Sequence, residues 1–179
     1  MKSKYMFLLF CIVVLTYSCG TTKCVGFSEK LTGWIPYSTN DIIEFYSTDD
    51  TLTFKVLNFT KSEPLEIKSN CDCMCGKPLA EFTTDIAKNG SELNGKLLES
   101  SGEIIYCFEK DDKNDSLVYN VYSGTPKTLN YSLKDTVLTN VIEVTNNNIN
   151  DVKKIYLHYG KGIVGFIDNL DREYKLILR

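Results

Sequence analysis

The chain has 179 residues, of which 43% are hydrophobic and 24% are charged, which suffices for one domain with a sizeable core and excludes a disordered chain. A formal net charge of -3 and a pI near 5.3 argue against a basic binding surface, so we expect no nucleic acid among the partners. The sequence has no internal repeat, and we expect a single domain after an amino-terminal targeting segment.

Residues 1–18 have the pattern of a secretory signal peptide. Lys2 and Lys4 precede an apolar run over residues 6–15. A helix that crosses a bilayer needs about 20 apolar residues, so this run is too short to span a membrane and fits the central part of a signal peptide. We expect cleavage directly before Cys19.

The cleavage region, Leu15-Thr16-Tyr17-Ser18-Cys19-Gly20, resembles the lipobox of bacterial lipoproteins. The resemblance implies that Cys19 carries diacylglycerol and a further acyl chain such as palmitate. The leucine stands one place further upstream than in the usual pattern, and Thr16 and Ser18 also fit ordinary signal cleavage without a lipid.

Gly20 gives the expected location. In Gram-negative lipoproteins an aspartate directly after the lipid-bearing cysteine favours the inner membrane, so Gly20 implies the outer membrane. Because no acidic run follows Cys19, we expect a domain that faces the periplasm. Residues 19–33 are polar and are expected to form a lipidated tether. Without Lys2 and Lys4 the chain keeps 18 basic and 23 acidic residues, which favours covalent over electrostatic membrane attachment.

Short alternating runs then predict β-strands. They cover residues 41–46, 51–59, 104–109, 117–122 and 137–144. A change of parity between Val56 and Leu57 predicts a bulge. The polar run 111–115 is expected to be a solvated turn of a hairpin, because it lacks the glycine and glutamate of a calcium loop. Residues 78–90 fit either a helix that starts at Pro78 or a strand.

The last thirty residues predict a three-strand meander over residues 153–159, 162–167 and 173–178. Both faces of the middle strand are apolar, with Ile163 and Ile167 on one and Val164 and Phe166 on the other, which indicates a central strand. Gly165 is expected to make room for an aromatic ring.

These elements predict one all-β domain over residues 34–179. We expect an antiparallel sandwich or a closed barrel with a C-terminal three-strand meander and at most one short helix. Three segments, Gly33-Trp34-Ile35-Pro36-Tyr37, Cys-x-Cys-x-Cys and Lys-Ile-Tyr…Gly-x-Gly-Ile, resemble small envelope lipoproteins of bacteroidete-type bacteria. Because those proteins have no assigned activity, the resemblance supports only the location and the fold class.

Five of the seven cysteines remain after Cys11 leaves with the signal peptide and Cys19 takes the lipid: Cys24, Cys71, Cys73, Cys75 and Cys107. An exported domain meets oxidising conditions, so disulfides are the first expectation, and an odd number leaves one thiol. The alternative is a soft-metal site for copper or zinc, because alternate residues of a strand share a face. Structural zinc sites usually use wider spacing.

We expect no enzyme and no cofactor. His158 is the only histidine, and it is expected to be a half-exposed strand residue. No Gly-x-Ser-x-Gly motif accompanies it, and the sequence has no P-loop or Gly-x-Gly-x-x-Gly fingerprint.

Three Asp-(Ser/Thr)-aliphatic triplets resemble the O-glycosylation sequon of exported proteins in the same bacterial group. Their hydroxyl residues are Thr51, Ser116 and Thr136. If the resemblance holds, all three must be exposed. The alternative is that Asp and Thr stand there because they suit strand starts.

Together these patterns predict a membrane-anchored envelope lipoprotein with a non-catalytic binding domain, attached to the membrane through the lipid on Cys19. Its partner would be a protein or an envelope polymer, with Trp34 and tyrosines as a possible contact surface. The alternative is a periplasmic carrier of a small apolar ligand, or of copper or zinc bound by Cys71, Cys73 and Cys75.

Overall fold

The computed structural model describes residues 27–62, 66–69, 72–75, 78–110, 113–122, 126–146 and 151–178. The signal peptide and Cys19 lie outside the described residues. The chain divides into two units, and the larger one comprises residues 27–63 and 77–179. The smaller unit includes an antiparallel hairpin of β3 (Glu66–Ser69) and β4 (Asp72–Cys75). Within the described part of the chain, no helix has the length and apolar character needed to cross a membrane.

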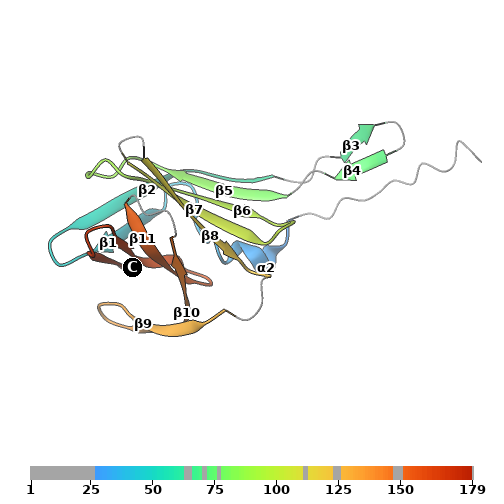
Figure 1. Ribbon diagram of the computed structural model, residues 1–179. Coiled ribbons are helices and arrows are strands. Elements are labelled where there is room, and N and C mark those ends of the chain that lie inside the picture. Colours follow the sequence, from blue (N-terminus) through green and yellow to red (C-terminus); the bar gives the residue numbers. More distant parts are fainter. Residues whose placement is uncertain are drawn as a thin grey trace, which may run out of the picture. The chain divides into compact units, whose positions relative to one another are not determined.

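The larger unit is one antiparallel sheet of eleven strands, curled into a half-barrel (Figure 1). Across the sheet the order is β8-β7-β6-β5-β2-β1-β13-β12-β11-β10-β9. The strands are β1 (Ile42–Tyr46), β2 (Thr51–Ser62), β5 (Leu79–Thr84), β6 (Glu92–Leu98), β7 (Glu103–Lys110), β8 (Lys113–Asn120), β9 (Thr128–Ser132), β10 (Val137–Thr145), β11 (Val152–His158), β12 (Gly162–Asp168) and β13 (Glu173–Leu176). A four-residue helix, α2 (Glu29–Thr32), precedes β1.

The expected all-β class and the C-terminal meander of β11, β12 and β13 are confirmed, and α2 is the one helix among the described residues. The half-barrel lies between the sandwich and the closed barrel that the sequence left open. Of the two alternatives for residues 78–90, the strand is the one observed, as β5. The predicted bulge after Val56 is also present, because the register between β2 and β5 shifts between Val56 and Asn58.

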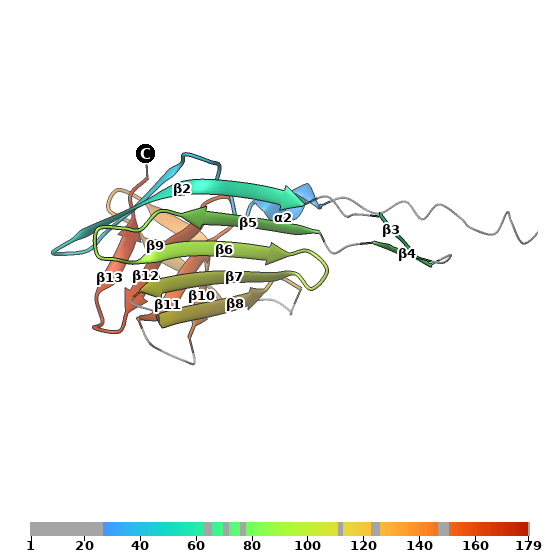
Figure 2. The same ribbon diagram turned by 90° about the horizontal axis from the view of Figure 1, so that it is seen from above.

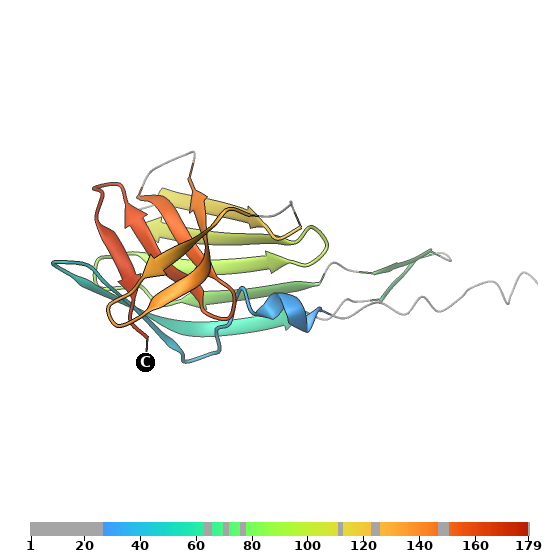
Figure 3. The same cartoon turned by 90° about the horizontal axis from the view of Figure 1, so that it is seen from below.

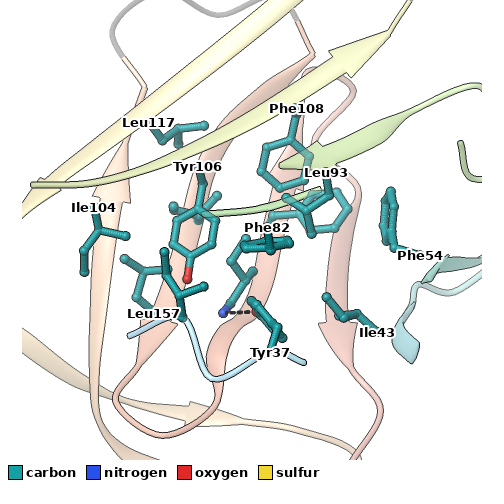
Figure 4. Close-up of a cluster of buried hydrophobic side chains, with 14 of the residues drawn as sticks. Tyr37, Ile43, Phe54, Phe82, Leu93, Ile104, Tyr106, Phe108, Leu117 and Leu157 are labelled. Atoms are coloured by element: carbon teal, nitrogen blue, oxygen red, sulfur yellow. Dashed lines mark hydrogen bonds between the residues drawn. The ribbon is translucent and has the colours of Figure 1, made fainter. Parts of the chain in front are cut away.

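The main core fills the concave face of the curled sheet (Figure 4). Alternate residues of β5 to β8 point into it and meet side chains of β11 and β12 from the opposite half. Phe166 is the central contact, because its ring lies 5.2 Å from Phe45 and 5.1 Å from Phe108, centroid to centroid. The fully buried members include Phe54, Phe82, Leu93, Ile104, Tyr106, Leu117, Ile155 and Leu157.

A second core lies on the other face of the meander, where β9 and β10 cover it. Its buried members are Tyr131, Leu133, Leu138, Val141, Tyr156 and Val164. Gly165 makes this contact possible, because a Cβ atom there would lie 2.2 Å from the Tyr131 hydroxyl oxygen. The predicted space for an aromatic ring at Gly165 is therefore confirmed.

The middle strand β12 is buried on both faces, as expected, but its residues are divided between the two faces differently from the prediction. Ile163 and Phe166 face the main core, whereas Val164 and Ile167 contact the second core. The reason is a register shift, since Tyr156 pairs with Gly165 and the next residue of β11 pairs with Ile163. One extra residue in β12 reverses the alternation that the sequence predicts.

The larger unit has two ends that carry different connections. At the α2 end lie α2, the β6–β7 turn and the β11–β12 turn, which are linked to the α2 segment by hydrogen bonds. The β1–β2, β5–β6 and β12–β13 turns form the far end, at the opposite ends of their strands (Figure 2). Figure 3 shows α2 in blue beside the end of β2.

Candidate functional site

The segment 27–37 closes the α2 end of the half-barrel. Phe27, Leu31 and Ile35 are buried; Leu31 lies on α2, and the other two lie on either side of it. Tyr37 follows them into the core, where its ring lies 4.6 Å from that of Phe82. The larger unit therefore has a buried residue, Phe27, at its first position.

Hydrogen bonds fix this segment to three different strands or turns. The Gly160 N–H donates to the Gly33 carbonyl at 2.6 Å, and the Tyr106 hydroxyl donates to the Trp34 carbonyl at 2.6 Å. The Tyr37 hydroxyl accepts the Ile163 N–H at 2.9 Å (Figure 4). Burial raises the pKa of both tyrosines, so each stays a neutral hydroxyl.

Surface contacts hold the first residues of the segment as well. Lys61 on β2 lies 2.6 Å from the Glu29 carboxylate and 5.3 Å from the centre of the Phe27 ring. The Ser28 N–H donates to the Glu99 carboxylate at 2.9 Å. Residues 27–33 are thus part of the fold, where the sequence suggested a tether up to residue 33. The sequence signal for this burial was the presence of two apolar residues, Phe27 and Leu31, in an otherwise polar stretch.

Three aromatic rings contact one another at this end, and a fourth, Tyr122, lies against its β6–β7 turn; we call the four residues the aromatic cluster: Trp34, Tyr119, Tyr122 and Tyr159. The Trp34 ring is half-buried, with its centroid 5.5 Å from the rings of both Tyr119 and Tyr159. Tyr159 is 48% exposed and Tyr122 is 60% exposed. Gly102 lets Tyr122 lie against the β6–β7 turn, because a Cβ atom there would meet the ring at 2.4 Å.

At the far end, Asp115 departs from the sequence expectation. It was expected in a solvated turn, but it lies on β8 and is only 1% exposed. Its carboxylate accepts hydrogen bonds from the Asn146 side chain at 3.0 Å and from the Val152 N–H at 2.7 Å. An inward-pointing carboxylate that binds the β10–β11 connection is a structural role that alternation alone does not predict.

Ion pairs hold the turns of the far end. Arg172 pairs with Asp168 at 2.6 Å, and Asp168 also accepts the N–H groups of Leu170 and Arg172. Lys153 pairs with Asp171 at 2.7 Å in the same region. These carboxylates have local structural partners, which explains their positions without a ligand.

The interior offers little space in the described part of the chain. One pocket of about 40 Å³ lies next to Phe54 and Phe108, which is room for about one water molecule. Two surface grooves of about 200 and 260 Å³ flank residues 176–178. A further surface groove, of about 500 Å³, lies at the β1–β2 and β12–β13 turns and is lined mainly by polar residues such as Asp49 and Arg172. Ligand pockets in proteins are commonly about 300–1,000 Å³ and mostly apolar, so this groove has a suitable size, but its polar lining does not favour an apolar ligand.

The candidate cysteines are distributed over both units. Cys73 and Cys75 are alternate residues of β4, paired in register with Lys68 and Glu66, while Cys24 and Cys71 lie outside the described residues. Cys107 is a free, half-buried thiol on β7 in the larger unit, 3.5 Å from the Ser116 hydroxyl. Among the described residues, no group of three His, Cys, Asp or Glu side chains is placed to hold a metal ion.

All three sequon hydroxyls satisfy the requirement for exposure. Thr51, Ser116 and Thr136 are each exposed on the larger unit. The structure thus leaves each one accessible to a modifying enzyme.

His158 is half-buried at the end of β11, as expected. Burial, and next the nearby Lys161, lower its pKa. Its Nδ1 atom is buried and has no hydrogen-bond partner.

No protein-family model, curated protein or solved structure matches the chain.

Proposed function

We propose that this protein is a lipoprotein of the cell envelope, anchored through acyl chains on Cys19, with a non-catalytic β-domain that binds a partner. The domain would face the periplasm from the outer membrane. The partner would be a protein or an envelope polymer.

The observation that carries the proposal is the short distance in sequence between Cys19 and Phe27, the first residue of the larger unit. Phe27 is buried and held by Lys61, only eight residues after Cys19. Eight extended residues span at most about 29 Å, so a lipid on Cys19 would keep the domain next to the bilayer. Two or three acyl chains suffice for stable attachment, whereas one gives marginal binding.

The two ends of the domain would then have different roles. The α2 end follows the anchor directly, and the far end lies at the other termini of the strands. The far end would thus be the more accessible to a partner in the periplasm. Attachment at one end and partner binding at the other require no catalytic group.

The carrier alternative receives no specific support from the described residues. The main core fills the concave face, and the pocket inside it has about 40 Å³. We therefore do not advance a second function.

Metabolic labelling with an alkyne analogue of palmitate tests the proposal. We expect label on the wild-type protein and on Cys24→Ala, and none on Cys19→Ala. Cys24 is the matched control because it lies in the same segment, five residues further on. Label that persists in Cys19→Ala, or an unlabelled wild-type protein in the soluble fraction, would overturn the proposal.

A further inference from the structure

We propose that the aromatic cluster lies in the headgroup region of the membrane that holds Cys19, so that the α2 end of the domain rests on the lipid surface. This inference rests on the proposed function and adds a defined orientation to it. The ligand is the polar interface of a bilayer, recognised by tryptophan and tyrosine side chains.

The first argument is reach. The α2 end is fixed to Phe27, which places it within about 29 Å of the lipid-bearing residue. The strand β12, Gly162–Asp168, separates the two ends by about 20 Å. The α2 end is thus the part of the larger unit that follows Cys19 most closely along the chain.

The second argument is the chemistry of the cluster. Tryptophan and tyrosine combine an apolar ring with a polar group, and both are enriched at the level of lipid headgroups. Tyr122 and Tyr159 expose about half or more of their surface, although both carry large rings. The Trp34 ring contacts the rings of Tyr119 and Tyr159, each with a centroid distance of 5.5 Å. Contiguous exposed apolar surface of this kind is found at sites that contact proteins or membranes.

The third argument is charge. Lys30 is exposed, and its carbonyl accepts the Tyr159 hydroxyl at 2.9 Å, while Lys161 follows two residues after Tyr159. Two acidic groups of this end have partners, since Glu29 pairs with Lys61 and the Glu99 Oε1 atom accepts the Ser28 N–H. Basic groups beside the cluster suit the phosphate groups of lipids, although the chain as a whole is acidic.

The chain contains one tryptophan, Trp34, so its fluorescence reports directly on this end. The acylated protein is purified from membranes and placed in vesicles of phosphatidylethanolamine and phosphatidylglycerol that carry brominated acyl chains. We expect loss of Trp34 emission, greater for bromine near the glycerol end of the chain than for bromine near the methyl end. Acrylamide quenching should fall at the same time.

Two pairs of variants separate orientation from attachment. Tyr122→Asp should reduce the quenching of Trp34, whereas Leu170→Asp should not, because Leu170 is 68% exposed on the β12–β13 turn at the far end. Leu170→Trp in a Trp34→Phe background should escape quenching by the same lipids. Near-ultraviolet circular dichroism shows whether each variant is folded. Because Tyr122→Asp and Leu170→Asp both retain Trp34, their comparison does not depend on a substitution of the fluorophore.

The outcomes distinguish this inference from the proposed function. Acylated protein whose Trp34 emission is insensitive to brominated lipid, or whose Leu170→Trp variant is quenched equally, overturns the orientation and leaves the anchor standing. Protein without acyl chains in its mass overturns both. Quenching of Trp34 by bromine near the glycerol end of the acyl chain, together with its loss in Tyr122→Asp, supports the inference.

Discussion

Asp115 and Asn146 form a hydrogen bond of 3.0 Å between the edge strand β8 and the residue that follows β10. The same carboxylate accepts N–H groups at the start of β11, and the Asn146 amide also donates to the Val152 carbonyl at 2.9 Å. The bond therefore joins one edge of the sheet to the opposite half of the half-barrel. An inward-pointing charge also protects an edge strand against pairing with other chains.

Replacement of Asp115 by alanine should destabilise the domain by about 3 kcal/mol, because it leaves buried N–H groups without an acceptor. The measurement is the urea midpoint followed by circular dichroism. Asp135→Ala is the matched control, since Asp135 is exposed and precedes a sequon hydroxyl in the same way. Its effect should stay within about 0.5 kcal/mol. Equal midpoints for the two variants would contradict the structural role of Asp115.

Gly165→Ala should destabilise the domain by about 1–3 kcal/mol through overpacking. The added Cβ atom would meet the Tyr131 hydroxyl oxygen at 2.2 Å and the Tyr174 carbonyl oxygen at 2.8 Å. Tyr131→Phe removes the closer of these atoms, so the double variant should recover part of the loss in a thermal melt. A Gly165→Ala protein as stable as the wild type would show that β9 does not cover the meander as described.

His158 should make stability depend on pH below about 6.5. Its pKa is lowered in the folded state, first by burial and then by Lys161, so the unfolded chain takes up the proton at higher pH. The contribution of His158 to the free energy of unfolding should be constant above the pKa of the unfolded chain. It should fall as the pH drops toward the lower pKa of the folded state. His158→Gln should flatten that part of the curve in urea titrations at several pH values. An unchanged slope would exclude His158 as its source.

Cys107 should remain a free thiol in the protein isolated without reductant. Its sulfur lies beside the Ser116 hydroxyl and has no disulfide partner. Alkylation of the unreduced, denatured protein followed by peptide mapping should label Cys107. Its recovery in a disulfide-linked peptide would contradict the structure of β7 and β8.

Thr136 should carry a glycan more readily than Ser116 if the Asp-(Ser/Thr)-aliphatic triplets are used. The aspartate of the second triplet, Asp115, is buried, whereas Asp135 and Val137 are both exposed. Glycopeptide mapping of the envelope-derived protein should find the modification at Thr136, and Thr136→Ala should lose it. Modification of Ser116 alone would contradict this order.

The sequence predicted those features that depend on alternation and turn chemistry. The meander, the bulge after Val56 and the space at Gly165 follow from period-two patterns and from the small size of glycine. Which residues of β12 share a face could not be predicted. The extra residue of β12 at the register shift after Tyr156 leaves no recognisable pattern in the sequence.

The α2 end was missed for a related reason. Phe27 and Leu31 are isolated apolar residues in a polar stretch, and only the tertiary contacts with Lys61 and the turns bury them. Long-range contacts likewise turn Asp115 from a turn residue into a buried acceptor. Neither effect has a local periodicity that the sequence could reveal.

The intact mass of the protein purified from its native membranes tests the lipid anchor most directly. We expect a chain that begins at Cys19 and is heavier than residues 19–179 by diacylglycerol and an amide-linked acyl chain. A mass that matches the uncleaved chain from Met1, without any lipid, would contradict it.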